Sequence, residues 1–64
     1  MNSAQIIKEL ERMGWVLARV KGSHNHFRHP SRPGLVTVQH PRRDVPPGTL
    51  RSIERQCGAQ LGKG

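Results

Sequence analysis

The chain opens with apolar residues repeated at the spacing of a helix. Ser3 is a suitable N-cap for this helix, because its hydroxyl can accept a bond from a free backbone N–H, and Gly14 is a suitable stop. The apolar positions fall on one face, as a period of about 3.6 residues requires: Ile6, Ile7, Leu10 and Met13. We therefore predict a first helix with a single buried stripe.

Three β-rich segments follow this helix, separated by short turns. The expected strands cover residues 15–20, about 25–29, and 35–40. Residues 21–23 form the first turn, and residues 30–34, which hold two prolines and a glycine, form the second. Turns this short join antiparallel neighbours, so the pattern predicts a three-stranded meander.

A second helix follows a stiff, basic connector at residues 41–48. This helix is expected to run from residue 47 or 49 to residue 56, with Asp44 capping or orienting its start and Gly58 ending it. Its buried stripe consists of Leu50, Ile53 and Cys57, with Leu61 as an extension. Cys57 is therefore interpreted as a buried structural thiol rather than a nucleophile.

The order of these elements predicts an α+β fold of the type α-β-β-β-α. Each helix has one apolar stripe, so both helices should pack on one face of the three-stranded antiparallel sheet and leave the other face open. We expect a single domain over residues 1–64, with residues 59–64 as a frayed tail. A chain this short buries only about 60% of its unfolded surface, which leaves no room for an internal substrate cavity. An active site would lie on the surface, where it suits a polymeric substrate.

Charge indicates what that polymer is. Eleven Lys and Arg residues stand against four Asp and Glu, for a formal net charge of +7 and an isoelectric point near 11.5. Such an excess is typical of proteins that bind polyanions, with nucleic acid as the first candidate, then an acidic protein, then an anionic membrane surface. The lone cysteine, the lack of a secretory signal and the lack of a long apolar run favour the cytoplasm.

Four histidines are the unusual chemical feature of the chain: His24, His26, His29 and His40. A histidine can take and give a proton near neutral pH, and RNA cleavage needs a base for the 2′-OH and an acid for the leaving 5′ oxygen. His24 and His26 share one strand face if the strand begins at residue 24, and that face is the open one if Phe27 points inward. We interpret His29 and His40 as strand-end residues, and we expect no metal site, although His24-x-His26 is a plausible ligand pair.

The residues around the first turn have candidate roles beside the ordinary structural ones. Gly22 is expected to take a left-handed backbone angle, and Ser23 to stabilise the turn or donate to a phosphate. The candidate phosphate-binding cations, each of which taken alone is more often a solvated surface charge, are Arg19, Lys21, Arg28, Arg42 and Arg43. Trp15 is interpreted as a core or rim residue rather than a base-stacking platform.

Two motifs carry a resemblance to a known family: Gly22-Ser23-His24, and His40-Pro41-x-x-Asp44-Val45-Pro46-x-Gly48-Thr49-Leu50-x-x-Ile53. With these motifs the sequence resembles the HicA family of bacterial type II toxins, which are messenger-RNA interferases with a fold like the double-stranded-RNA-binding domain. The similarity also covers Gly14-Trp15, Phe27-Arg28-His29-Pro30, Pro33-Gly34, Gln56 and Gly58.

The resemblance implies an endoribonuclease that needs no metal or other cofactor, with His24 as its essential residue. It also implies a HicB-type antitoxin as partner, beside RNA. Family members often have a second histidine directly after the first, whereas this chain has Asn25 and then His26. The role of His26 as a partner acid is therefore an inference from strand geometry and not from the family. The alternatives from the residues alone are a non-catalytic basic RNA-binding module and a domain that docks an acidic protein.

Overall fold

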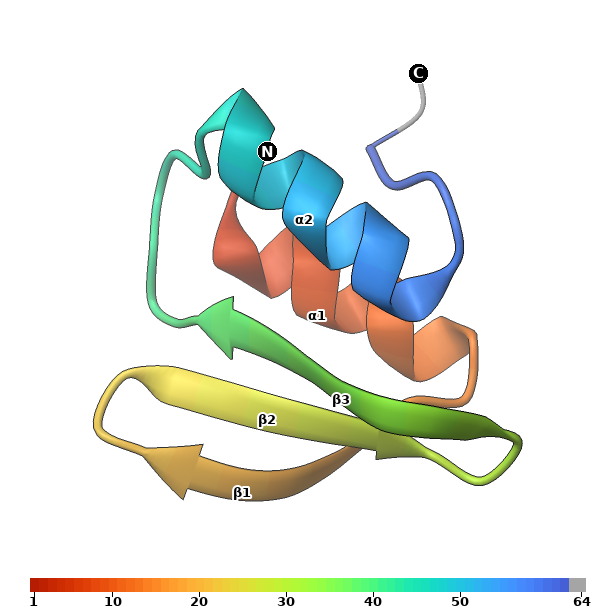
Figure 1. Cartoon of the computed structure of the whole chain (residues 1–64). Coiled ribbons are helices and arrows are strands. Elements are labelled where there is room, and N and C mark those ends of the chain that lie inside the picture. The colour runs from red at the N-terminus through yellow and green to blue at the C-terminus, as the bar shows by residue number, and fades with distance from the viewer. Residues whose placement is uncertain (63–64) are drawn as a thin grey trace.

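The computed structural model describes residues 1–62, and its elements follow the order α-β-β-β-α (Figure 1). They are α1 (Ser3–Arg12), β1 (Val16–Lys21), β2 (His24–His29), β3 (Arg32–Gln39) and α2 (Pro47–Cys57). The strands form one antiparallel sheet in the order β1-β2-β3. The predicted α+β fold with a three-stranded meander is confirmed.

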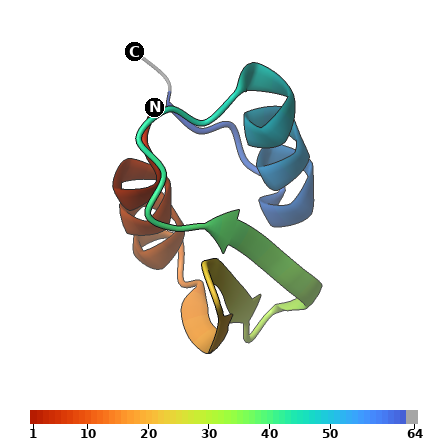
Figure 2. The same cartoon turned by 90° about the vertical axis from the view of Figure 1, so that its left-hand side faces the viewer.

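Both helices lie on the same side of the sheet, as Figure 2 shows. The core between helices and sheet is built from Ile6, Leu10, Trp15, Phe27, Val36, Val38, Val45, Ile53, Cys57 and Leu61. Phe27 and Trp15 are both buried, as expected from their places in the sequence. The helices pack against β3, whereas all six residues of β1 are exposed. The opposite face of the sheet has no covering element within residues 1–62 (Figure 2).

The start of α1 differs from the prediction. Asn2, and not Ser3, is the N-cap: its side-chain Oδ1 accepts from the Gln5 N–H at 2.8 Å, and the Gln5 side chain accepts from the Asn2 N–H at 2.9 Å. This reciprocal capping box satisfies two free N–H groups at once. Ser3 consequently lies inside the first turn of α1, and its hydroxyl is left for a different contact.

The second turn is shorter than predicted, because β3 already begins at Arg32 and only Pro30 and Ser31 lie between the strands. Gly34 has φ of +82°, in the left-handed region that favours glycine. The pairing also shifts register here, since His29 pairs with Arg32 but Phe27 with Val36. A bulge at Gly34 therefore lets the strand continue where the composition suggested a turn.

The start of α2 also corrects a prediction. Its N-cap position is Pro46, and no side chain caps the helix, so Asp44 does not have the expected capping role. Proline at the first helical position, Pro47, needs no hydrogen-bond partner for its nitrogen and already has a helical φ. The predicted stop at Gly58 is confirmed, since its φ is +71° and its N–H donates to the Glu54 carbonyl.

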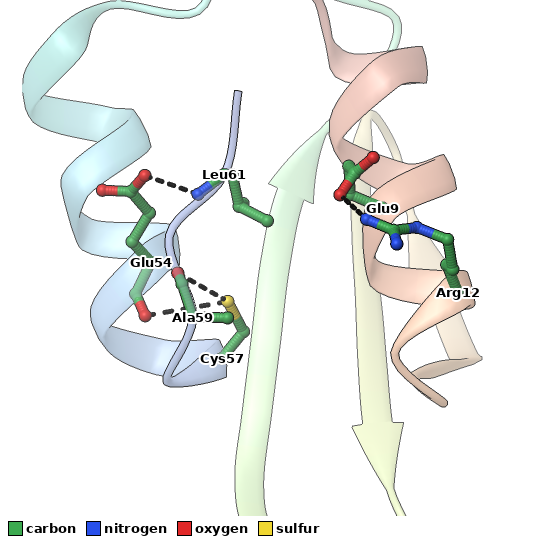
Figure 3. Close-up of polar contacts among 6 residues, drawn as sticks. All are labelled: Glu9, Arg12, Glu54, Cys57, Ala59 and Leu61. Atoms are coloured by element: carbon green, nitrogen blue, oxygen red, sulfur yellow. Dashed lines mark hydrogen bonds and ion pairs between the residues drawn. The ribbon is translucent and has the colours of Figure 1, made fainter. Parts of the chain in front are cut away.

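The segment after α2 packs against the helix rather than fraying. Leu61 is only 4% exposed, and its backbone N–H donates to the Glu54 carboxylate at 2.8 Å (Figure 3). The buried Cys57 thiol lies 3.6 Å from the carbonyl oxygens of Glu54 and Ala59. The expectation of a frayed tail at residues 59–64 is therefore wrong for residues 59–61, and Lys63 and Gly64 lie outside the described residues.

Candidate active site on the open sheet face

The uncovered side of the sheet, here called the open face, is built from three rows of side chains that run across the strands. Since Phe27, Val36 and Val38 point into the core, the residues that alternate with them point outward. The rows are Lys21–His24–Gln39, Arg19–His26–Thr37, and Val16–Arg28 with Leu35 beside them. The prediction that His24 and His26 share the open face agrees with this register, because β2 begins at His24.

His24 is the most accessible histidine of the site. It is exposed, it is the first residue of β2, and the histidine ring bonds found within residues 1–62 involve only His26, His29 and His40. The turn before it contains Gly22, whose φ of +59° is left-handed as predicted. A β-carbon at Gly22 would meet nothing, so the turn selects glycine for its backbone angle and not for space.

The turn that presents His24 is held by a backbone bond from beyond β3. The His40 N–H donates to the Ser23 carbonyl at 2.7 Å, so antiparallel pairing continues one residue past each strand end. His24 therefore sits on a well-supported turn although its own ring is free.

His26 is half-buried, and its ring has a partner on the neighbouring strand. His26 Nδ1 lies 2.8 Å from Thr37 Oγ1, within hydrogen-bond distance. Its Nε2 has no hydrogen-bond partner within residues 1–62. Thr37 was not among the residues singled out in the sequence, because its place opposite His26 depends on the strand register.

His29 has a structural role. Its Nδ1 accepts from the Ser31 N–H at 3.0 Å, which leaves Nε2 to donate to the Met13 carbonyl at 2.9 Å. The ring also packs edge-to-face on Trp15, with 5.1 Å between centroids. Both nitrogens are therefore engaged, and His29 joins the end of β2 to the end of α1.

His40 ties α1 to the connector between β3 and α2. Ser3 Oγ accepts from the Arg42 N–H at 2.7 Å, so the hydroxyl can donate its own proton to His40 Nδ1, also at 2.7 Å. The Ser3 N–H donates in turn to the Arg42 carbonyl at 2.8 Å. Ser3 is 2% exposed, so these bonds replace water for a buried hydroxyl. The sequence contains no local signal for this contact, which spans 37 positions.

The predicted cations divide between the open face and the connector. Arg19, Lys21 and Arg28 belong to the rows of the open face and are exposed. Arg42 reaches the same face from the connector, because its guanidinium donates to Gln39 Oε1 at 2.8 Å and Gln39 pairs with His24. Arg43, together with Arg42, lines a surface pocket beside the start of α1.

Negative charge is absent from the strands. The four carboxylates of the chain all lie on the helices or the connector: Glu9, Glu11, Asp44 and Glu54. The open face consequently carries basic side chains and no carboxylate, beside histidine, amide, hydroxyl and apolar groups. Neither of the two surface pockets described for residues 1–62 includes His24, which lies exposed on the sheet face.

The part of the chain that the structure describes, residues 1–62, contains neither a cluster of metal-ligating side chains nor a membrane-spanning helix. No group of three or more His, Cys, Asp or Glu side chains there is arranged to hold a metal ion. No helix in the same range combines the length and the apolar character that crossing a bilayer requires.

The fold and the open face define a small, basic α-β-β-β-α domain. Its sheet has no carboxylate, and it presents a histidine, His24, whose ring makes no hydrogen bond within residues 1–62. Residues 3–59 match the family described as HicA toxin of bacterial toxin-antitoxin, and the chain therefore belongs to the HicA toxin family. A chain in the solved "HicA3 and HicB3 toxin-antitoxin complex" superposes with a TM-score of 0.81 at 32% sequence identity, over 97% of this chain and 100% of that one. No curated protein sequence matches. The family resemblance noted in the sequence is thus confirmed.

Proposed function

We propose that this protein is a toxin that cleaves messenger RNA without a metal ion, with His24 as an acid–base group of the reaction. The observation that carries the proposal is the position of His24: an exposed ring with no partner in residues 1–62, in the Gly22-Ser23-His24 motif and among cations. A ring without an internal partner has both nitrogens available for substrate.

The proposed reaction uses the substrate's own 2′-OH as nucleophile. A base removes the 2′ proton while the 2′ oxygen bonds to phosphorus, the bond from phosphorus to O5′ breaks, and an acid gives a proton to O5′. The products are a 2′,3′-cyclic phosphate and a 5′-hydroxyl. His24 and His26 lie two residues apart on one strand face, about 7 Å along β2, so one phosphate can reach both rings. His26 is the proposed helper.

Cations of the open face would stabilise the charge that develops on the phosphate. We assign this role to Arg19, Lys21 and Arg42, which the strand register and the Gln39 contact bring to the rows that hold the histidines, and to Arg28 in the adjacent row. Gly22 and Ser23 would contact the RNA backbone at the turn. Arg43 would bind the RNA further along the strand, beyond the connector.

A HicB-like antitoxin is the proposed protein partner, since the solved relative is part of a HicA3–HicB3 complex. A positive face without carboxylates suits an acidic surface as well as RNA. Messenger RNA as substrate places the proposed activity in the cytoplasm.

The decisive assay incubates the purified protein with single-stranded RNA in excess chelator. Wild type should shorten the RNA, and His24→Ala should not, while the folded control Lys8→Ala, an exposed cation on α1, should cleave normally. Cleavage that stops on chelation would overturn the metal-free mechanism. Salt-sensitive binding without any change in RNA length would instead support the alternative, a non-catalytic RNA-binding module.

Expression in bacteria tests the toxin role separately. Induction should arrest growth, and both His24→Ala and co-expression of a HicB-like protein should relieve the arrest. Equal growth with wild type and His24→Ala, at equal protein abundance, would contradict it.

A further inference from the structure

We infer that Thr37 is a positioning residue for His26: its hydroxyl occupies Nδ1 and so makes Nε2 the nitrogen that exchanges a proton with the substrate. The inference rests on the proposed function for its catalytic meaning, but the contact itself can be tested without RNA. It starts from the 2.8 Å distance between His26 Nδ1 and Thr37 Oγ1.

The strand register explains why these two side chains meet. Thr37 pairs with His26, yet its backbone N–H donates to the Gln56 side chain of α2 at 3.1 Å, and therefore points away from β2. Opposed residues whose N–H groups point outward form the non-hydrogen-bonded type of antiparallel pair, with Cα atoms about 4.5 Å apart and side chains close together. Gln56 thus covers the free edge of β3 at the level of His26.

Threonine is well suited to hold a ring in this position. Its β-branched side chain has few χ1 rotamers in a strand, so the hydroxyl keeps one direction. When His26 is protonated, its Nδ1–H donates to Thr37 Oγ1, and the proton on Nε2 is the one available to O5′. After that proton leaves, Nδ1 keeps its hydrogen and its partner, and Nε2 can accept the next proton.

His24 has no equivalent holder. Its cross-strand neighbour Gln39 is engaged by the Arg42 guanidinium at 2.8 Å, and no bond within residues 1–62 involves the His24 ring. The two histidines of the open face therefore differ: one ring is oriented by the protein and the other is free to follow the substrate.

The test compares Thr37→Val, which keeps the shape but removes the hydroxyl, with Thr37→Ser, which restores it. The first measurement is the nitrogen NMR spectrum of the imidazole rings in the RNA-free protein, where His24 is the internal reference. In Thr37→Val the His26 ring shifts should move toward those of His24, and in Thr37→Ser they should return toward wild type. Thr49→Val, an exposed threonine on α2, is the matched control and should change neither ring.

The second measurement is the RNA cleavage rate of the same folded variants. Thr37→Val should lower it by about tenfold, the usual size of one lost hydrogen bond, and Thr37→Ser should recover most of the loss. Unchanged His26 ring shifts in Thr37→Val would overturn the inference, as would a rate loss that Thr37→Ser does not recover. Absence of cleavage by wild type, with the ring shifts behaving as expected, would overturn the proposed function and leave the Thr37–His26 contact established.

Discussion

The two faces of the sheet are made from the same strands but have opposite properties. On the covered face Phe27, Val36 and Val38 are at most 1% exposed, whereas on the open face His24 and Arg28 are exposed to solvent. Because successive residues of a strand point to opposite sides, β2 contributes to packing and to the candidate site in alternation. A small domain can thus present chemistry on a surface that the core directly supports.

The histidines follow the same division. His24 and His26 lie on the open face, and His29 and His40 bond to main-chain or hydroxyl groups near α1. The four histidines therefore divide into two candidate site residues and two structural residues. The groups that surround each ring distinguish the two pairs. This comparison leads to four predictions, from the largest expected effect to the smallest.

His24→Ala should lower the RNA cleavage rate by a factor of about 10²–10⁴, the usual contribution of an acid–base group. The free energy of unfolding should stay within about 0.5 kcal/mol of wild type, since the ring is exposed and has no internal partner in the described chain. Cleavage kinetics and chemical denaturation of the same sample test both statements. A variant that unfolds more readily would mean that His24 belongs with the structural histidines.

Phe27→Ala should destabilise the protein by about 3–5 kcal/mol, because it empties the centre of the core. The control on the opposite face is Leu35→Ala, where the side chain is 48% exposed and the cost should be about 1 kcal/mol or less. Chemical denaturation measures both. Similar costs for the two variants would show that the two faces do not differ in burial as described.

Ser3→Ala should destabilise the protein by about 1–3 kcal/mol, since it leaves the Arg42 N–H without an acceptor and His40 Nδ1 without its partner. Ser31→Ala, at an exposed turn position, is the matched loss of a hydroxyl and should cost little. Thermal unfolding compares the two. A neutral Ser3→Ala would rule out a structural role for the Ser3–His40 contact.

Arg19→Gln combined with Lys21→Gln should weaken RNA binding. It should also make the plot of log binding constant against log salt concentration less steep by roughly 1.4, because each lost phosphate contact on a single strand contributes about 0.7 to that slope. The control with the same change in charge is Arg51→Gln with Arg55→Gln on α2, which should leave the slope nearly unchanged. Binding of a non-cleavable RNA analogue across salt concentrations gives both slopes. A larger effect of the α2 pair would place the RNA on the helical side.

Much of this organisation could be predicted from the sequence, because it depends on periodicity. The two helical stripes and the alternation around Phe27 were enough to predict the architecture and to place His24 and His26 together. What could not be predicted depends on contacts between distant residues or on competing local options. Ser3 was a reasonable cap, but Asn2 with Gln5 forms a better one.

Other misses have similar causes. The burial of Leu61 agrees with its expected place as an extension of the α2 stripe, so the error lay in the expected fraying of residues 59–61. The bond from the Leu61 N–H to the Glu54 carboxylate, which helps to hold this segment on α2, has no signal in the sequence. The register of β3 places Thr37 opposite His26 and Gln39 opposite His24, and this register could not be predicted from the sequence. Strand register over a bulge such as that at Gly34 is set by packing, which a single sequence does not display.

The most direct test of the division between the two faces is the RNA cleavage rate of the four single histidine-to-alanine variants, measured under conditions where each is fully folded. Loss of activity should be greatest for His24→Ala and substantial for His26→Ala, while His29→Ala and His40→Ala, although less stable, should cleave at close to the wild-type rate. Normal cleavage by folded His24→Ala, or an equal loss in folded His29→Ala, would contradict the account.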